Sequence, residues 1–335
     1  MTKLERIILQ TRPVAFIIHK SKQIVLPGFY GVPLYDAFRF FLKQIKRVGL
    51  NERASAISFN FIMAIPAACI CVFTLVPYLP VSKQFTAELL RLTRDLSPNQ
   101  NTYNFVNTFL EDFLNTERGG LLSFTFLLVI FYASNAMLTV MRTFDKSIYQ
   151  YAKQESFIKK RWRAIKLTAI VLGLMIGVIL VLIGQTILFD LMLKWLNIKG
   201  SGIIWAKILR WIITITLFFY GIALIYKFGP SVKKRWSTLS PGSILATFLT
   251  ILTTYVFSFW VNNFSDYNKV YGSIGTVLIL MLLIYINSLI LLIGFELNVS
   301  ITYLRAEADE RRQKEMAGLI ETEVLPKLSN QNLTK

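Results

Sequence analysis

The chain has 335 residues, of which 54% are hydrophobic and 17% are charged, and its mean hydropathy is +0.51. This apolar content excludes an ordinary soluble domain and predicts a membrane protein. The formal net charge of +18 would fit a nucleic-acid partner, but 28 of the 37 Lys and Arg residues fall in segments predicted to share one side of a membrane. These segments are 1–54, 142–166, 227–240 and the tail after 303. Membrane topology therefore explains the charge, and no nucleic-acid binding is predicted.

The apolar stretches predict an all-α, polytopic membrane protein with six transmembrane helices and short amphipathic interfacial helices. Each stretch is long enough to cross about 30 Å of hydrocarbon. The predicted spans are 55–80, 119–141, 164–190, 203–226, 242–262 and 273–299. Residues 1–54 form a basic lead, residues 55–303 the membrane domain and residues 304–335 a polar tail. An even number of spans and the basic segments place both termini in the cytoplasm.

Before the first span, the segment from Leu34 to Leu50 predicts an amphipathic helix, with Phe38 and Phe41 opposite Arg39 and Lys43. Two interpretations stay open. The helix either lies on the membrane surface, where its cations meet anionic lipid headgroups at the cytoplasmic face, or packs on the inner face of the protein. Two further amphipathic helices are predicted outside the membrane, in 85–96 and 105–113.

Pro66 lies inside the first span, where it removes a backbone hydrogen bond that no water can replace. A helix break or kink is predicted there. Broken helices form binding sites in many transporters, but ordinary proline kinks are also common. The tail after Tyr303 is predicted to extend the last helix and then become disordered.

Several polar side chains lie in the cytoplasmic halves of otherwise apolar spans, where such groups are costly unless they are hydrated or paired. They are Asn60, Asn135, Arg142, Asn287, Glu296 and Asn298. One hypothesis is an inward-open polar cavity in which Glu296 contacts a substrate or a coupling proton beside Asn60, Asn135 and Arg142. The alternative is that Glu296 pairs with a nearby arginine while the asparagines form hydrogen bonds between helices.

Four short motifs carry a family resemblance. They are Ser58-Phe59 before Pro66, Pro241-Gly242, "YGSIG" (Tyr271 to Gly275) and "GFELN" (Gly294 to Asn298). In order and spacing they resemble the YihY/BrkB family of bacterial inner-membrane proteins, over about residues 35–303. The resemblance implies a multi-pass helical protein of the bacterial inner (cytoplasmic) membrane with a transport role. One departure is Ile284-Tyr285, where similar members have a Trp before the Tyr.

Some members of that family have been labelled ribonuclease BN, but the sequence gives no support for an enzyme. A metal-dependent nuclease needs clustered His and carboxylate ligands, whereas His19 is the one histidine and has no acidic cluster near it in sequence. No metal site and no cofactor is predicted. The favoured function is a transporter, lipid flippase or exporter, and the alternative is a membrane scaffold or envelope-assembly factor that does not transport.

Overall fold

The computed structural model describes the backbone of 19–25, 28–29, 31–78, 100, 104, 107–108, 110, 118–148, 155–196, 201–232, 235–263 and 266–332. Within these ranges, the side chains of 76, 178–196, 201–207, 209–210, 261–263, 266–274, 276 and 315–332 are not described. The predicted helices in 85–96 and 105–113 lie largely outside the described residues. The described part contains helices and no strand, which confirms the all-α fold class.

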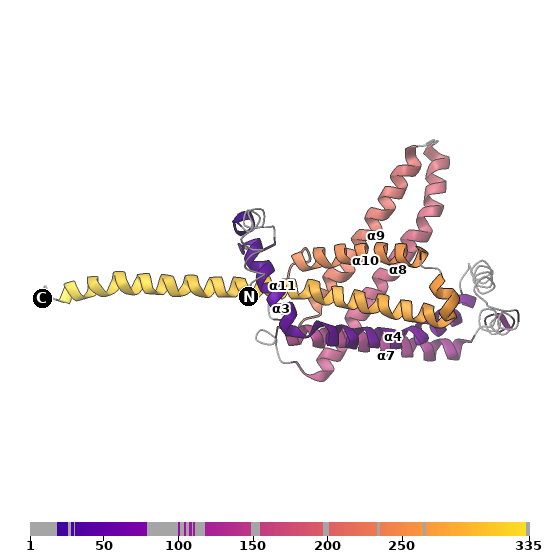
Figure 1. Ribbon diagram of the computed structural model, residues 1–335, viewed down its shortest axis with the longest axis horizontal. Helices are drawn as coiled ribbons and strands as arrows, with labels where there is room; N and C mark the ends of the chain where they lie inside the picture. Colours follow the sequence, from indigo (N-terminus) through magenta and orange to yellow (C-terminus); the bar gives the residue numbers. More distant parts are fainter. Residues whose placement is uncertain are drawn as a thin grey trace.

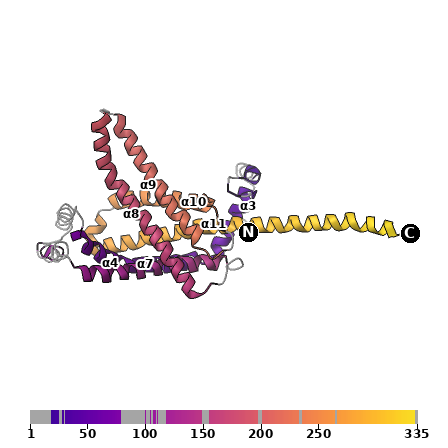
Figure 2. The ribbon, with the colours of Figure 1, turned by 180° about the vertical axis from the view of Figure 1, so that it is seen from behind.

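The helices are α3 (Leu34–Val48), α4 (Leu50–Leu75), the short 3-10 helix η1 (Val76–Tyr78), α7 (Gly119–Ser147), α8 (Phe157–Leu196), α9 (Ser201–Phe228), α10 (Pro241–Asn263) and α11 (Asp266–Asn332). Figure 1 shows α4, α7, α10 and α11 running roughly parallel, with α3 crossing one end of this bundle and α11 continuing beyond it. Helices α8 and α9 lie side by side and leave the bundle obliquely, as the view from behind also shows (Figure 2).

Five helical segments in the described part are long and apolar enough to cross a membrane: Leu50–Leu75, Gly119–Ser147, Trp211–Phe228, Pro241–Trp260 and Val277–Lys314. They coincide with five of the six predicted spans. The remaining prediction, 164–190, lies within α8, whose side chains are described only as far as Gly177. The count of six spans therefore stays a prediction.

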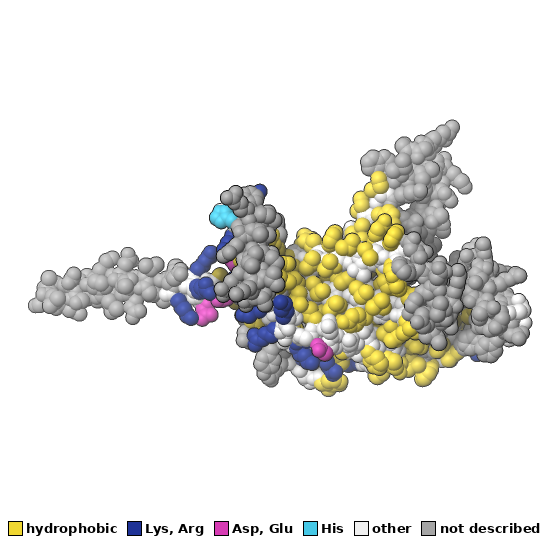
Figure 3. All heavy atoms as spheres, viewed as in Figure 1, with side chains coloured by type: hydrophobic (Ala, Val, Ile, Leu, Met, Phe, Trp, Pro, Cys, Tyr) yellow, Lys and Arg dark blue, Asp and Glu magenta, His cyan; other side chains and the backbone are white. Residues whose placement is uncertain are grey.

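Most charged residues of the described part gather at one end of the bundle, which we call the basic end, whereas Arg118 lies where α7 begins, at the other end. There α3 meets the start of α4, the end of α7 and the point where α11 leaves the bundle. Figure 3 shows Lys and Arg side chains at this end and hydrophobic side chains over the flank of the bundle. Exposed apolar residues such as Phe126, Leu127 and Phe248 cover the flank, as expected for surfaces that face lipid.

Two turns at the basic end are set by particular residues. Gly49, between α3 and α4, has φ 64° and ψ 55°, a left-handed conformation that favours glycine and ends α3. Pro241 occupies the first position of α10, where its missing N–H group breaks no helical hydrogen bond. Both turns bring helix ends together around α11.

Of the predicted break or kink at Pro66, the break is absent, because α4 continues through this residue to Leu75, and the kink stays a prediction. A proline inside a membrane helix removes one N–H donor but leaves the rest of the hydrogen-bond ladder in place. The predicted amphipathic helix from Leu34 is present as α3, which packs its buried residues Ala37 and Phe41 against α11. Its contact with the protein matches one of the two interpretations of this segment.

Candidate functional site

Five consecutive residues of α11, Gly294 to Asn298, are all buried, and together they contact the helices around them. We call this run the hub. Because successive residues of a helix point about 100° apart, a run of five presents side chains in all directions. The hub therefore stands where the neighbouring helices meet at the basic end.

Gly294 brings α11 into backbone contact with α10. A Cβ atom added at Gly242 would lie 2.0 Å from the Gly294 carbonyl oxygen, and one added at Gly294 would lie 2.6 Å from the Gly242 carbonyl oxygen. Beside this contact, the Tyr226 hydroxyl of α9 donates a hydrogen bond of 2.7 Å to the Leu291 carbonyl oxygen of α11. Only glycine at both positions permits this approach.

Asn298 forms hydrogen bonds with polar groups at the start of α10. Its Oδ1 atom accepts a hydrogen bond of 2.8 Å from the Gly242 N–H group, and its Nδ2 atom donates one of 2.9 Å to the Ser240 hydroxyl. The first N–H groups of a helix have no partner within the helix. Ser240 caps α10 locally by accepting a hydrogen bond of 3.3 Å from the Ser243 N–H group, and the carboxamide from α11 satisfies the Gly242 N–H group beside it. This is a hydrogen bond between two elements, the kind of contact that the alternative hypothesis describes.

Phe295 packs into an aromatic cluster formed by α7, α9 and the segment before α10. Its ring stacks on Phe144 with the centroids 3.7 Å apart, and the rings of Tyr226 and Trp236 meet it edge-on at 5.9 and 5.1 Å. Phe144, Tyr226 and Phe295 are almost completely buried. This packing fixes the rotation of α11, and with it the direction of Glu296.

Glu296 is completely buried and connects α11 to α7 and α4. Its Oε1 atom accepts a short hydrogen bond from the Ser147 hydroxyl and lies 3.8 Å from Nη1 of Arg53. Arg53 also donates a hydrogen bond of 2.7 Å to the Ser147 hydroxyl, so the three side chains form a continuous relay. The Arg53 side chain is 18% exposed, which leaves it partly accessible from outside.

A cavity of about 470 Å³ opens at the basic end over this relay. Arg53 and Ser147 line it directly, and Glu296 lies behind them. The other lining residues are Phe40, Gln44, Arg47, Val48, Lys146 and Tyr303. The described residues of its wall include three cations and no carboxylate, so the cavity is suited to a negatively charged group.

The six polar residues singled out from the sequence do not share one cavity. Asn60 and Asn287 donate hydrogen bonds to carbonyl oxygens of their own helices, those of Ala56 and Leu283. Asn135 accepts a short hydrogen bond from Arg161 of α8. None of these asparagines lines the cavity over the relay.

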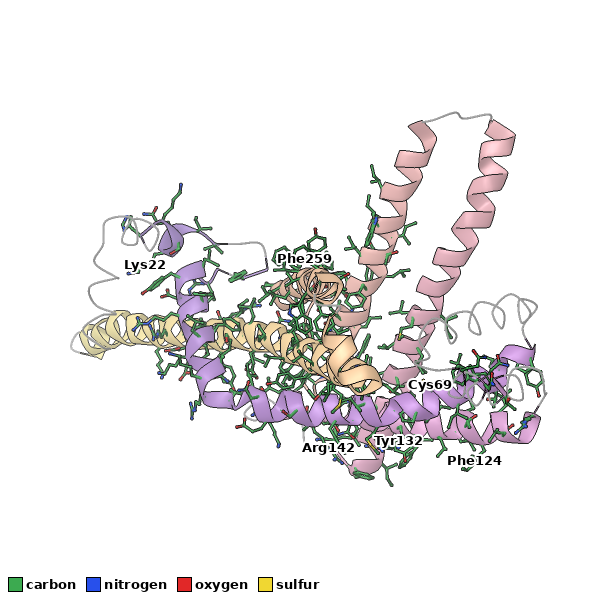
Figure 4. All side chains as sticks on the ribbon, turned by 45° about the vertical axis from the view of Figure 1, so that its right-hand side comes forward. Lys22, Cys69, Phe124, Tyr132, Arg142 and Phe259 are labelled. Atoms are coloured by element: carbon green, nitrogen blue, oxygen red, sulfur yellow. The ribbon has the colours of Figure 1, made fainter. Side chains whose placement is uncertain are left out.

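Arg142 does not pair with Glu296. It is exposed on the outer side of α7, where its guanidinium lies 5.8 Å from the centroid of the Phe157 ring (Figure 4). The partner of Glu296 is Arg53, which the sequence analysis did not select. The buried stripe of α7, which includes Met137, Met141 and Phe144, could have excluded Arg142, because position 142 lies about 200° around the helix from position 144.

A second polar network joins α7 and α8 to the segment after α9. Asp145 accepts hydrogen bonds from the backbone N–H and the hydroxyl of Ser231, at 2.8 and 2.9 Å, and pairs with Lys160 at 2.8 Å. Arg163 donates to the same hydroxyl at 2.5 Å and pairs with Glu155 at 3.2 Å. These pairs hold the basic ends of the helices together. Sequence spacing did not predict the bonds of Ser231, because Asp145 and Arg163 lie more than 60 residues from it along the chain.

Fold and site together define a multi-pass helical membrane protein with a cationic cavity at one end of its bundle. The family described as Virulence factor BrkB matches residues 41–318, and the chain belongs to this family. The hub, the contacts between Gly242 and Asn298, and every lining residue of the cavity except Phe40 lie within the matched region.

Several curated proteins are similar over most of the chain. The "Putative ribonuclease-like protein YfkH" of Bacillus subtilis is 28% identical over 284 residues, covering 81% of this chain and 98% of that protein. A UPF0761 membrane protein of Haemophilus influenzae is 24% identical over 265 residues, covering 77% and 91%. One from Tolumonas auensis is 21% identical over 273 residues, covering 78% and 84%. No solved structure matches the chain.

Proposed function

We propose that this protein is a transporter or flippase of the bacterial inner membrane that takes an anionic solute, or the anionic headgroup of a lipid, from the cytoplasmic side. The observation that carries this proposal is the cavity at the basic end, whose wall contains Arg47, Arg53 and Lys146 and no carboxylate. Its volume of about 470 Å³ is that of a small-molecule site.

The orientation in this proposal rests on the positive-inside rule, which places the basic end and both termini in the cytoplasm. Reporter fusions test it. Fusions at Asn99 and Asn197 should report the outer side, and a fusion at Lys153 the inner side. An outer signal at Lys153 would reverse the orientation.

The relay suggests how binding could be coupled to a change in the protein. Arg53 contacts Ser147 and Glu296 on one side and lines the cavity on the other. An anion in the cavity competes with Glu296 for the guanidinium. When Arg53 turns toward the anion, Glu296 is left buried without its cation, which favours uptake of a proton or a shift of α11 against α4 and α7.

The transport test uses the purified full chain in liposomes. Movement of a fluorescent phosphatidylglycerol across the bilayer reports lipid transport, and uptake of labelled inorganic phosphate or glycerol phosphate reports a soluble anion. Arg47→Gln combined with Lys146→Gln should reduce the rate at least about tenfold, because each cation near the surface contributes about 1 kcal/mol to anion binding.

The matched control is Arg311→Gln combined with Lys314→Gln, which removes the same charge from exposed pairs on the extension of α11. This control should transport at the unmodified rate. Equal rates in the cavity variant and the control would contradict the assignment of the cavity.

The second candidate is a scaffold or envelope-assembly factor. It is favoured by the hub, in which Glu296 and Asn298 connect helices, and by Asn60 and Asn287, which bond within their own helices. Absence of transport by the unmodified protein, together with failed complementation only in variants that disrupt the hub, would favour this candidate over transport.

We do not extend the ribonuclease-like name of the Bacillus subtilis relative to this chain. Among the described residues no three His, Cys, Asp or Glu side chains gather as a metal site would require. We expect the purified protein not to cleave RNA. Cleavage that is lost when one of its own residues is replaced would contradict this expectation.

A further inference from the structure

A second groove lies at the basic end, between the first turns of α8 and the segment that follows α9. Its volume is about 540 Å³. It is lined by Ile158, Lys159, Trp162, Arg163, Lys166, Leu167, Ile170, Phe228 and Arg235. It shares no lining residue with the cavity over the relay.

The groove carries an excess of positive charge. Lys159, Lys166 and Arg235 form no ion pair with any described residue, and no acidic side chain lines the groove. The remaining cation, Arg163, is already paired with Glu155. Arg235 lies over the Phe228 ring at 4.9 Å, which holds its guanidinium at the groove wall. Because these cations line one groove and have no acidic partner among the described residues, an anion bound there is favourable.

The same groove has an apolar edge. Ile158, Trp162 and Ile170 lie at four- and eight-residue spacings on one face of α8, and Trp162 is 61% exposed. An exposed tryptophan at the end of a membrane helix is typical of the interface between headgroups and hydrocarbon. A small soluble anion has no apolar part that could contact these side chains, whereas a lipid has one.

The order of residues along α8 matches the layers of a lipid. At 1.5 Å per residue, Lys159 and Lys166 are separated by about 10 Å along the helix, and Ile170 lies about 6 Å farther toward the apolar part. Beyond it, Met175 and Ile176 are also exposed. Cations at headgroup depth are therefore followed by apolar side chains at acyl-chain depth.

We propose that this groove binds an anionic phospholipid of the leaflet at the basic end. Lys159, Lys166 and Arg235 contact its phosphate, Trp162 packs against the headgroup and glycerol, and Ile170 contacts the acyl chains. This site is independent of any transport through the other cavity. It would fix α8 and the end of α9 against the bundle in membranes rich in anionic lipid.

Lipid binding to the purified full chain in detergent tests the proposal, by native mass spectrometry and by thermal stabilisation. Phosphatidylglycerol should bind and raise the unfolding temperature, whereas phosphatidylcholine and inorganic phosphate should not. Lys159→Gln combined with Lys166→Gln should weaken phosphatidylglycerol binding about 30-fold, at about fivefold for each cation. Lys159→Arg combined with Lys166→Arg, which keeps the charge, should bind within about threefold of the unmodified protein.

Arg311→Gln combined with Lys314→Gln is again the control with equal loss of charge, and it should bind phosphatidylglycerol normally. Equal weakening in the control and the groove variant would overturn the site. If inorganic phosphate stabilised the protein as much as phosphatidylglycerol, the assignment of a lipid to this groove would be wrong. The two proposals are tested separately. Weaker phosphatidylglycerol binding by the groove variant supports this site whether or not the unmodified protein transports an anion, and absence of transport would contradict only the proposed function.

Discussion

Two stretches of the same helix, α11, differ in how far their side chains are exposed. From Val277 to Leu282 several side chains are 40 to 55% exposed, whereas the hub from Gly294 to Asn298 is wholly buried. Asn287, between them, bonds to its own helix, and Asn298 bonds to α10. The same type of side chain therefore has a local role at position 287 and a connecting role at position 298, where α11 touches α10.

The close approach of Gly242 and Gly294 accounts for this difference, and its loss should have the largest effect. In Gly242→Ala the added Cβ would lie 2.0 Å from a backbone oxygen, so α10 and α11 must separate. We expect a loss of more than about 3 kcal/mol in the free energy of unfolding, because the obstacle is backbone and cannot rotate away. Denaturant unfolding of the purified protein and its yield in the membrane measure the loss.

Gly221→Ala in α9 is the matched control for this variant, since nothing lies within 4 Å of its added Cβ. It should be as stable as the unmodified chain or slightly more stable. Similar stability of the two variants would mean that the crossing is looser than described.

A smaller effect is expected from Asn298→Ala. The change leaves the Gly242 N–H group without its acceptor in a buried place, which costs about 1 to 3 kcal/mol. The same measurement of unfolding applies. An Asn298→Ala protein that unfolds like the unmodified protein would show that another group can cap α10.

The smallest effect is expected from Asn287→Ala, whose Nδ2 atom bonds only to the Leu283 carbonyl oxygen of its own helix. That oxygen keeps its helical partner, so the change should stay within about 0.5 kcal/mol. A loss equal to that of Asn298→Ala would remove the contrast between the two parts of α11.

Hydrophobicity predicted most of the helices, because length and apolar content alone decide whether a segment can cross a bilayer. The predicted span begins at 164, whereas α8 begins at Phe157, because Lys159, Lys160 and Arg161 continue the helix beyond the apolar stretch. The hydrophobicity pattern also identified Glu296 and Asn298 as polar residues within an apolar span. Their partners, Arg53 and the start of α10, are set by how the helices rotate against each other, which depends on contacts such as Phe295 on Phe144.

The central claim is that the charge of Glu296 competes with an anion in the cavity for Arg53. Glu296→Gln tests it most directly, because it keeps the shape of the side chain and a hydrogen bond to Ser147 while it removes the charge. Glu296→Ala is the comparison, since it also removes the packing and leaves Arg53 without its anionic partner. It should lower the free energy of unfolding by about 3 kcal/mol. Membrane abundance, complementation of a deletion strain and transport in liposomes should be measured for both.

We expect Glu296→Gln to accumulate in the membrane like the unmodified protein and to lose at least about tenfold in transport rate, equivalent to about 1.4 kcal/mol. Full transport and full complementation by Glu296→Gln would contradict the claim, because the charge of Glu296 would then have no part in the function.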